Sequence, residues 1–258
     1  MSKIKLSAMI VTRNEERKIR RCLESLGWLD EIVVVDQSSV DNTVKICNEY
    51  TDKVFTVPNK NFCEPDRALA ASKATNNWLL YMDADEVIPP ELKEEIERIL
   101  EGSPGYDSYY IPRKNIFLGR WIRGSGWYPG YVLRLFKKGS VKFLEDIHTN
   151  PAPLTGYGYL KEHIIHYTCE DLKEYMDKID RYSSVMASQA YERGERVTIW
   201  NFAAKMFALP VIYFLHRFLF KLGVRDGLQG LLIASLTGFN IFITNVKIWK
   251  MRKNGANT

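Results

Sequence analysis

Four short apolar runs alternate with segments of helical periodicity over the first hundred residues. The runs are Ile4 to Thr12, Glu31 to Val35, Val54 to Val57 and Trp78 to Met82. The helices expected around them are Asn14 to Leu26, a segment ending at Tyr50, Asp66 to Ala74, and Glu91 to Leu100. This alternation predicts βαβ units, and therefore an α/β fold with a Rossmann-like, mostly parallel sheet and flanking helices. Polar residues that follow the strands then lie at the carboxyl edge, where open α/β sheets bind ligands.

Composition limits the class of protein. The chain has 258 residues, 46% of them hydrophobic, which suits one large domain or one domain with an appendage. Its net charge of +5, from 36 basic and 31 acidic residues, does not require a nucleic-acid partner. Four scattered cysteines predict reduced thiols in a cytoplasmic protein, and Met1 to Leu6 is too short and too charged to be a signal segment.

The rest of the chain changes character twice. Residues 106–153, rich in Gly, Tyr, Trp and Arg, predict short strands and long loops of the kind that bind an acceptor. From Glu170 the pattern is helical, and Leu228 to Val246 has nineteen residues without a formal charge. This stretch can just cross a bilayer, but its polar residues favour an interfacial helical hairpin, and a buried core helix or a dimer interface is the alternative. We therefore expect a catalytic domain at 1–168, with halves 1–105 and 106–168, and a membrane-associating helical region at 169–258.

An acidic motif follows the fourth apolar run. Asp83 and Asp85 are separated by one residue and lie directly after Met82. Two carboxylates at a strand end form a site for a hard divalent cation and the phosphates that it carries. The alternative is a solvated acidic turn that caps the helix after Pro89.

Polar residues also follow the first two runs. Thr12, Asn14 and Glu15 end the first, and Asp36 ends the second. These groups can bind a base and a ribose, with the carboxylate of Asp36 accepting from an imide N–H, whereas ordinary helix capping by Asn14 and Asp41 is the alternative. Neither a G-x-G-x-x-G nor a P-loop pattern is present. Arg67 can reach a diphosphate from the side opposite a metal, unless it is a solvated helix residue.

These motifs together resemble family 2 glycosyltransferases. The segments that carry the resemblance are Thr12-Arg13-Asn14-Glu15-Glu16, Val33-Val34-Val35-Asp36 with Ser39, Asp41 and Thr43, Arg67, and Trp78 to Glu86. Within that family, the chain most resembles small bacterial lipopolysaccharide-core β-glucosyltransferases that extend the inner core from a heptose. The further matches, which extend the likeness to essentially the whole chain, are Gly119 to Arg123, Trp127 to Pro129, Leu133 to Phe136 and Arg225 to Gly227.

The resemblance implies a GT-A fold, a UDP-hexose donor, a bound Mg²⁺ or Mn²⁺, and inversion at the anomeric carbon. By position, Thr12, Glu15 and Asp36 would hold the uridine, Arg67 and Asp83 the ribose and diphosphate, and Asp85 the metal. The expected reaction moves a hexose, with glucose from UDP-glucose favoured, to a lipid-anchored inner-core sugar such as heptose. The enzyme would then work in the cytoplasm, peripherally on the inner face of the bacterial inner membrane. Transfer to a polyprenyl-linked glycan or a protein, and a non-catalytic sugar-nucleotide or lipid-binding scaffold, are the rival functions.

The general base is expected in the middle region. Asp146 and Glu145 are the candidates, because such enzymes place a carboxylate there, facing the anomeric carbon. The family pattern has Asp after Trp-Tyr-Pro and Glu after the His, where this chain has Gly130 and Thr149. A surface turn is the alternative for Glu145 and Asp146.

Two further groups of residues bear on ligands. Among the histidines, which include His148, His166 can complete the metal shell, whereas His163 is expected to be a hydrogen-bonded core residue. A cluster of basic and aromatic residues suits an acidic glycolipid acceptor, with a solvated basic face as the alternative. Its members are Arg113, Lys114, Arg120, Arg123, Arg134, Lys137, Lys138, Trp121, Trp127, Tyr128 and Tyr131.

Overall fold

The computed structural model describes residues 5–60, 62–144 and 149–255, with side chains described as far as Met251. The chain divides into two compact units. We call the first, Met1–Lys114 with Gly130–Tyr167, the sheet unit, and the second, Asn115–Pro129 with Thr168–Thr258, the helical unit. Each is described by itself.

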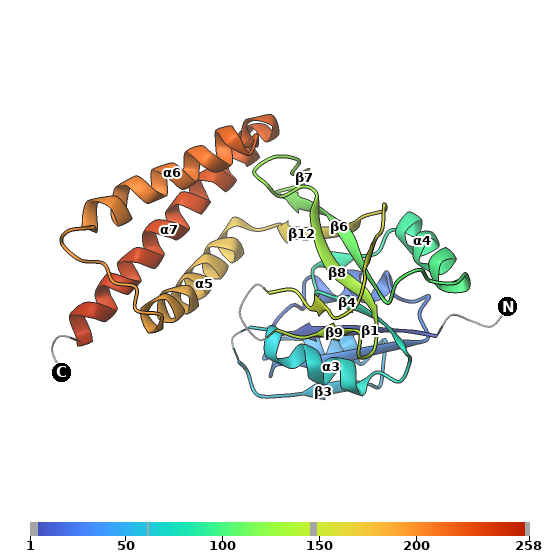
Figure 1. Ribbon diagram of the computed structural model, residues 1–258. Coiled ribbons are helices and arrows are strands. Elements are labelled where there is room, and N and C mark those ends of the chain that lie inside the picture. The colour runs from blue at the N-terminus through green and yellow to red at the C-terminus, as the bar shows by residue number, and fades with distance from the viewer. Residues whose placement is uncertain (1–4, 61, 145–148, 256–258) are drawn as a thin grey trace. The chain divides into compact units, whose positions relative to one another are not determined.

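A ten-stranded mixed sheet forms the centre of the fold, in the order β3-β2-β1-β4-β8-β6-β12-β5, with β11 and β7 also paired to β6 (Figure 1). The strands of this sheet are β1 (Leu6–Thr12), β2 (Glu31–Asp36), β3 (Val54–Thr56), β4 (Trp78–Met82), β5 (Glu86–Val87), β6 (Ser108–Phe117), β7 (Arg120–Trp121), β8 (Gly130–Lys137), β11 (Gly158–Tyr159) and β12 (Ile164–Cys169). A separate antiparallel pair is formed by β9 (Val141–Lys142) and β10 (Ala152–Pro153).

The four strands predicted in the first hundred residues form the parallel part of this sheet. Thr12 is in register with Asp36, and Ile10 with Met82, so β1, β2 and β4 end at the same edge. Beyond β4 the sheet becomes antiparallel, since Leu80 of β4 pairs with Leu135 of β8. The middle region thus extends the same sheet, and its longest strand, β6, has ten residues rather than the short strands expected there.

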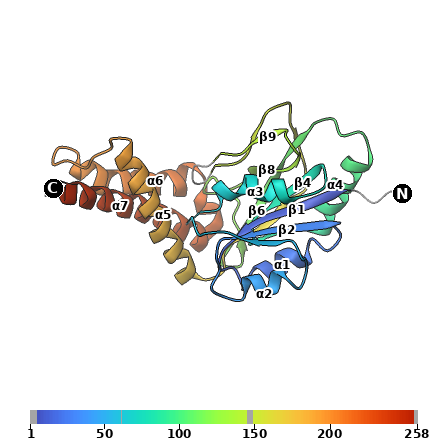
Figure 2. The same ribbon diagram turned by 90° about the horizontal axis from the view of Figure 1, so that it is seen from below.

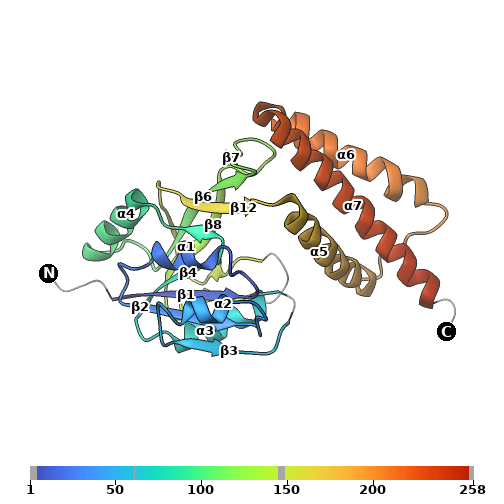
Figure 3. The same cartoon turned by 180° about the vertical axis from the view of Figure 1, so that it is seen from behind.

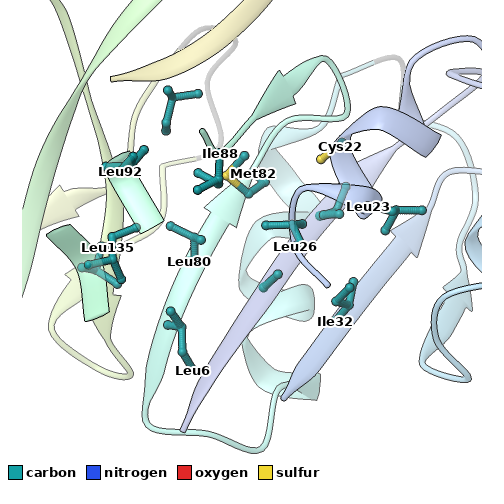
Figure 4. Close-up of a cluster of buried hydrophobic side chains, with 14 of the residues drawn as sticks. Leu6, Cys22, Leu23, Leu26, Ile32, Leu80, Met82, Ile88, Leu92 and Leu135 are labelled. Carbon is teal, nitrogen blue, oxygen red and sulfur yellow. The ribbon is translucent and has the colours of Figure 1, made fainter. Parts of the chain in front are cut away.

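Helices cover both faces of the parallel strands. They are α1 (Ile19–Glu24), α2 (Thr43–Cys47), α3 (Arg67–Lys73) and α4 (Pro90–Glu101), with a 3₁₀ turn at Glu64–Asp66. Side chains of α1 and α4 share one buried cluster with alternate residues of β1, β2 and β4, and part of it is drawn in Figure 4. The opposite face packs against Ala70 and Ala71 of α3, which lies across the sheet from α1 and α2 (Figure 2).

The first helix is shorter than its periodicity predicts. We expected it to begin at Asn14, but α1 begins at Ile19. Asn14 has a φ of +52°, in the left-handed region that a right-handed helix excludes. Its side-chain Oδ1 instead accepts from the backbone N–H of Val40, at 2.8 Å. A tertiary contact with the loop after β2 therefore overrides the helical pattern at residues 14–18.

Three long helical segments dominate the helical unit. They are α5 (Leu172–Glu192), the segment around α6 (Leu209–Leu215), and α7 (Gly227–Gly255); π-helical stretches at Ala204–Ala208 and His216–Phe220 flank α6, and a 3₁₀ turn, Gly223–Asp226, precedes α7. In Figures 1 and 3, α5 and α6 both run beside α7. The apolar stretch Leu228 to Val246 lies wholly within α7.

Candidate active site

Residues at the carboxyl ends of β1 and β2 form the first wall of the site. Thr12 and Asp36 are neighbours in the parallel register and are 1% and 0% exposed. Each oxygen of Asp36 accepts from Ser39, Oδ2 from the backbone N–H at 2.8 Å and Oδ1 from the hydroxyl at 2.5 Å. The hydroxyl of Thr12 is buried and has no hydrogen-bond partner among the residues that the structure describes. A buried hydroxyl without a partner costs free energy, so it marks a position where a ligand can supply the missing bond.

Two loops lock together beside these strand ends. The backbone N–H of Asn14 donates to Ser39 Oγ at 2.8 Å, and that of Glu15 donates to Thr43 Oγ1 at 2.8 Å. Asp41 accepts from the N–H of Thr43, the first residue of α2, at 3.0 Å. Asp41 therefore binds the first backbone N–H of α2, but from the residue before the N-cap, which is Asn42. Asn14 instead joins the β1 loop to the β2 loop. The structure thus brings Thr12, Asn14, Glu15 and Asp36 together, as their spacing in the sequence predicts.

The acidic motif forms a tight turn after β4. The N–H of Glu86 donates to the carbonyl of Asp83 at 3.0 Å, and the N–H of Asp83 donates to the side chain of Glu86, also at 3.0 Å. Glu86 is fully buried, whereas the side chain of Asp83 is 32% exposed and that of Asp85 is 14% exposed. The third acidic residue therefore shapes the turn, which leaves Asp83 and Asp85 as the carboxylates that a ligand can reach.

A buried arginine from β8 neutralises this turn. Arg134 is 2% exposed, and its Nη2 donates to Glu86 Oε1 at 2.8 Å and to Asp83 Oδ2. Its guanidinium lies over the ring of Tyr81, 4.3 Å from the centroid, and Nη1 of Arg113 lies 3.5 Å from the same oxygen of Glu86. We expected Arg134 to belong to a basic surface that binds an acceptor, and this was wrong. The sequence does indicate this burial, because Arg134 lies within an apolar strand. An arginine buried in this way requires a carboxylate partner.

Arg67 reaches the same turn from the start of α3. It is 7% exposed, so it is not the solvated residue of the alternative interpretation. Its Nε donates to the hydroxyl of Tyr81 at 2.9 Å, and this hydroxyl donates to Asp83 Oδ1 at 2.7 Å. Burial raises the pKa of Asp83, but the charges of Arg134 and Arg67 more than offset this, so that the net pKa lies below its ordinary value. Asp83 is therefore held as a carboxylate with a partner on each oxygen.

Asp85 lies beside His166 of β12. His166 pairs with Glu86 in the antiparallel register, and its Nε2 is 3.4 Å from Asp85 Oδ1. The N–H of Tyr167 donates to the carbonyl of Asp85 at 2.9 Å and fixes the backbone there. The structure thus places His166 beside Asp85, with Asp83 two residues earlier in the turn. Within the described residues, these three do not by themselves form a group that could hold a metal ion.

The donor atoms of Asp83, Asp85 and His166 suit a divalent cation whose remaining ligands come from a diphosphate. A carboxylate and an imidazole nitrogen lie within 3.4 Å of each other, and Asp83 is close by in the same turn. No group of three or more His, Cys, Asp or Glu arranged as a metal cage occurs within residues 5–60, 62–144 and 149–251. Mg²⁺ in nucleotide enzymes is usually bound by one or two carboxylates plus phosphate oxygens, so a small protein donor set fits this role.

The predicted bases Glu145 and Asp146 lie outside the described residues, as does His148. Thr149 follows them directly, and its carbonyl accepts from Nη1 of Arg67. The role of the two carboxylates stays a prediction. His163, expected in the core, is half-buried.

Comparison with known proteins establishes the family. The model of "Glycosyl transferase family 2" matches residues 7–157, more than half of the chain and the region that contains every residue of the site except His166. This chain belongs to glycosyl transferase family 2. It is therefore a glycosyltransferase, as the resemblance implies.

Relatives match along the whole chain. The lipopolysaccharide core biosynthesis glycosyltransferase LpsC of Rhizobium meliloti is 29% identical, over 96% of this chain and 93% of its own. An uncharacterised glycosyltransferase of Rickettsia typhi is 27% identical, over 98% and 89%. Both alignments include the helical region, so this family 2 enzyme shares more than the sheet unit with them.

A solved structure shares the fold. S. aureus TarS 1-349 in complex with UDP-GlcNAc has a TM-score of 0.52 and 17% identity, and the match covers 95% of this chain and 92% of that one. This likeness and the mixed sheet flanked by helices confirm the predicted GT-A fold for this glycosyltransferase.

Proposed function

We propose that this glycosyltransferase moves a hexose, with inversion, from a UDP-hexose to an inner-core sugar of a lipid-anchored lipopolysaccharide. The observation that carries the proposal is the meeting of the Thr12 and Asp36 wall with the Asp83-Asp85 turn at one edge of the sheet. A nucleotide and a metal-bound diphosphate need those two kinds of surface side by side. The membership in family 2 supplies the reaction class.

The donor would bind across the strand ends. Thr12 offers an unpartnered hydroxyl for the base, Glu15 and Asp36 offer carboxylates, and Asn14 holds their loops together. Asp83 would accept from a ribose hydroxyl while Arg67 contributes positive charge to the diphosphate. The solved TarS complex contains UDP-GlcNAc, which makes a UDP-sugar the first donor class to test.

Asp85 is the first candidate ligand for Mg²⁺ or Mn²⁺, with His166 and Asp83 as the other protein donors. When bound, such a cation supplies charge neutralisation to the diphosphate leaving group. The remaining work falls to the protein: Arg67 and Arg134 keep Asp83 ionised and in place, and Asp146 or Glu145 would take the proton from the acceptor hydroxyl. Direct attack by that oxygen inverts the anomeric carbon without a covalent enzyme intermediate.

The name of one relative supports the proposed acceptor. LpsC is named for lipopolysaccharide core biosynthesis and aligns with this chain over nearly its full length. Glucose as the sugar and heptose as its acceptor are the finer part of the proposal. A polyprenyl-linked glycan or a protein is the alternative acceptor, and a scaffold that binds donor without transfer is the alternative of a different class.

We also infer that the enzyme works peripherally at the cytoplasmic face of the inner membrane. One segment of the described residues, Gly223–Met251, is long and apolar enough to cross a bilayer. However, α7 packs along α5, and Nζ of Lys247 in α7 donates a hydrogen bond to Oδ1 of Asp180 in α5, at 2.7 Å. A bilayer-crossing α7 would carry the charges of α5 into hydrocarbon, which is costly. An interfacial position avoids this cost.

The test is release of UDP from a panel of UDP-hexoses in Mg²⁺ or Mn²⁺, with and without a heptose-terminated glycolipid. Acceptor-stimulated release from one donor, lost in Asp85→Ala, supports the transferase and names its sugar. A polyprenyl-linked glycan and an acceptor protein form the rival arms. Donor binding without release in every arm would favour the scaffold.

A further inference from the structure

The last segment of the chain is strongly basic. Residues 196–258 contain nine Lys and Arg and a single acidic residue, Asp226, which gives this stretch a formal charge of +8. The whole chain carries only +5, so the remaining residues are net negative. The net positive charge of the protein therefore comes from the segment that also holds α6 and α7, although most of its basic residues lie elsewhere and are balanced by acidic ones.

The single acidic residue is used inside the helical unit. Asp226 is 2% exposed; its Oδ1 accepts from the N–H of Arg123 at 3.0 Å, and its Oδ2 from that of Gly124 at 2.7 Å. The turn before α7 is thereby fastened to the loop at residues 118–129. A Cβ on Gly124 would lie 2.2 Å from the carbonyl oxygen of Leu222, so only glycine allows this approach.

This fastening gathers five cationic side chains from two distant segments of sequence. Arg120 donates to the carbonyl of Arg225 at 3.4 Å, and Arg217 donates to the carbonyl of Ser125 at 2.6 Å. Lys221 lies beside Gly126, where a Cβ would be 3.5 Å from its Cδ. Arg123 stacks on Trp121, with 4.2 Å from the guanidinium carbon to the ring centroid. The described part of the chain gives none of these five side chains a carboxylate partner.

Large apolar side chains are exposed at the same turn. Phe220 is 78% exposed, Leu228 66% and Val224 53%, and each is within a few residues of a cation of the cluster. We call this set, namely Arg120, Arg123, Arg217, Phe220, Lys221, Val224, Arg225 and Leu228, the turn patch. Exposed apolar groups between cations are typical of a surface that meets anionic lipid, where the apolar groups enter the acyl boundary and the cations meet headgroup phosphates.

We infer that the turn patch is the membrane-docking site of this enzyme and that its occupant is an anionic lipid bilayer surface, bound through headgroup phosphates. The combination of charge and exposure favours this occupant: cations that have no carboxylate partner in the described part of the chain lie among apolar side chains that are 53% to 78% exposed. A bilayer surface offers phosphates and an apolar interior side by side at the same place. The inference deepens the proposed function, since it rests on a lipid-anchored acceptor. It also gives the loop at residues 118–129 a role, as the element tied to the membrane by Asp226.

The experiment is co-sedimentation of the full chain with vesicles of phosphatidylcholine alone or with phosphatidylglycerol, in low and high salt. We expect binding that needs the anionic lipid and weakens with salt. The double variant Lys221→Glu with Arg225→Glu should lose about 30-fold or more in partition, since each cation near an anionic surface contributes about 1 kcal/mol. The matched control is Lys45→Glu with Lys142→Glu, which makes the same change of charge at exposed positions of the sheet unit and should bind as the wild type does.

Two further readouts keep the inference separate from the proposed function. Phe220→Ser with Leu228→Ser removes apolar area at constant charge, and it should weaken binding while leaving the salt dependence in place. UDP release without acceptor should be equal in all variants. Vesicle binding therefore measures docking, and UDP release measures catalysis separately. Equal partition of the Lys221 and Arg225 variant and the wild type would overturn the inference. So would equal binding to neutral vesicles, or a dimer in solution that depends on Phe220 and excludes vesicles.

Discussion

The two ends of the parallel strands bury carboxylates in different ways. At the amino edge, Glu31 is 8% exposed and accepts from the backbone and hydroxyl of Thr75, at 2.7 and 3.0 Å, and from Ser7 and Lys53. At the carboxyl edge, Asp83 is one-third exposed, Asp85 lies beside His166, and the buried hydroxyl of Thr12 has no partner. The hydrogen bonds of the first network are complete within the protein, whereas the second network leaves polar groups that a bound ligand can satisfy.

We call the network around Glu31 closed and the network at the carboxyl edge open. We expect the closed network to contribute mainly to stability and the open one mainly to function. A closed network gains its full free energy on folding, so its loss should lower stability and leave the chemistry of the folded fraction unchanged. An open network holds polar groups whose partners arrive with a ligand, and its loss should reduce binding or turnover more than stability. Arg134 is the intermediate case, because it closes the turn and also sets the position of Asp83.

The largest effect is expected at Asp85. Asp85→Asn keeps the volume of the side chain but removes the charge that a divalent cation requires, so turnover should fall about 10³-fold, the scale of losing a principal electrostatic contact in a transition state. Steady-state UDP release in a metal titration measures it. The melting temperature should stay within a few degrees of the wild type, because asparagine keeps the size of the side chain and the backbone carbonyl that accepts from Tyr167 is unchanged.

The matched control for the Asp85 variant is Glu95→Gln. It removes an equal charge from a partly exposed carboxylate on α4, which accepts from the N–H groups of Lys161 and Glu162. It should leave turnover and metal dependence unchanged. Turnover of Asp85→Asn close to that of the wild type, at saturating metal and donor, would contradict the open-network interpretation.

The second prediction tests the intermediate case. Arg134→Met should destabilise the protein by about 3 to 5 kcal/mol, because it removes the closer of the two cations around the buried Glu86 and leaves only Arg113, at 3.5 Å. Denaturant unfolding measures this loss. Arg134→Lys keeps the charge but loses the planar guanidinium, whose Nη2 donates to both Asp83 and Glu86, so it should recover much of the stability and little of the turnover. Full recovery of turnover in the lysine variant would show that Arg134 acts through charge alone.

The third prediction concerns the closed network. Burial by itself raises the pKa of Glu31, but the hydrogen bonds from Lys53, Ser7 and Thr75 outweigh this and lower the pKa to about 2, below its usual 4.5. A depressed carboxyl pKa contributes stability above the unfolded value, and this contribution is lost as the pH falls from 4.5 towards 2. Glu31→Gln should therefore cost about 2 kcal/mol at pH 7, allowing for the solvent exposure of Lys53.

The control for the Glu31 prediction is to repeat the stability comparison over a range of pH. The stability difference between Glu31→Gln and the wild type should shrink as the pH is lowered through 4.5, when urea unfolding is followed at each pH. Turnover per folded molecule should match that of the wild type. A difference in stability that does not change with pH would mean that packing, and not charge, dominates at this position.

The sequence predicts the parallel half of this fold better than the rest for a physical reason. Strands β1, β2 and β4 are buried on both faces, so each is a largely apolar run that ends in a polar residue or, in β4, is followed directly by one. Their common carboxyl edge then places Thr12, Asp36 and Asp83 together without further information. In contrast, Asn14 leaves the helical pattern because of Val40, and the pairing of Arg134 with Asp83 joins residues 51 positions apart. The pairing of Arg134 with Asp83 depends on the register of β8 against β4, which no local pattern encodes.

The smallest effect, and the most selective, is expected at Thr12. Its hydroxyl is buried and makes no hydrogen bond in the protein alone, so Thr12→Val, which replaces it with a methyl group of similar shape, should keep or slightly raise the melting temperature. If the hydroxyl binds the nucleotide, the same variant should raise the KM for the donor up to about tenfold, the value of one neutral hydrogen bond, with kcat nearly unchanged. Thr12→Ser retains the hydroxyl and should restore the KM. A variant that is less stable but has the wild-type KM would place Thr12 with the closed network at the other edge.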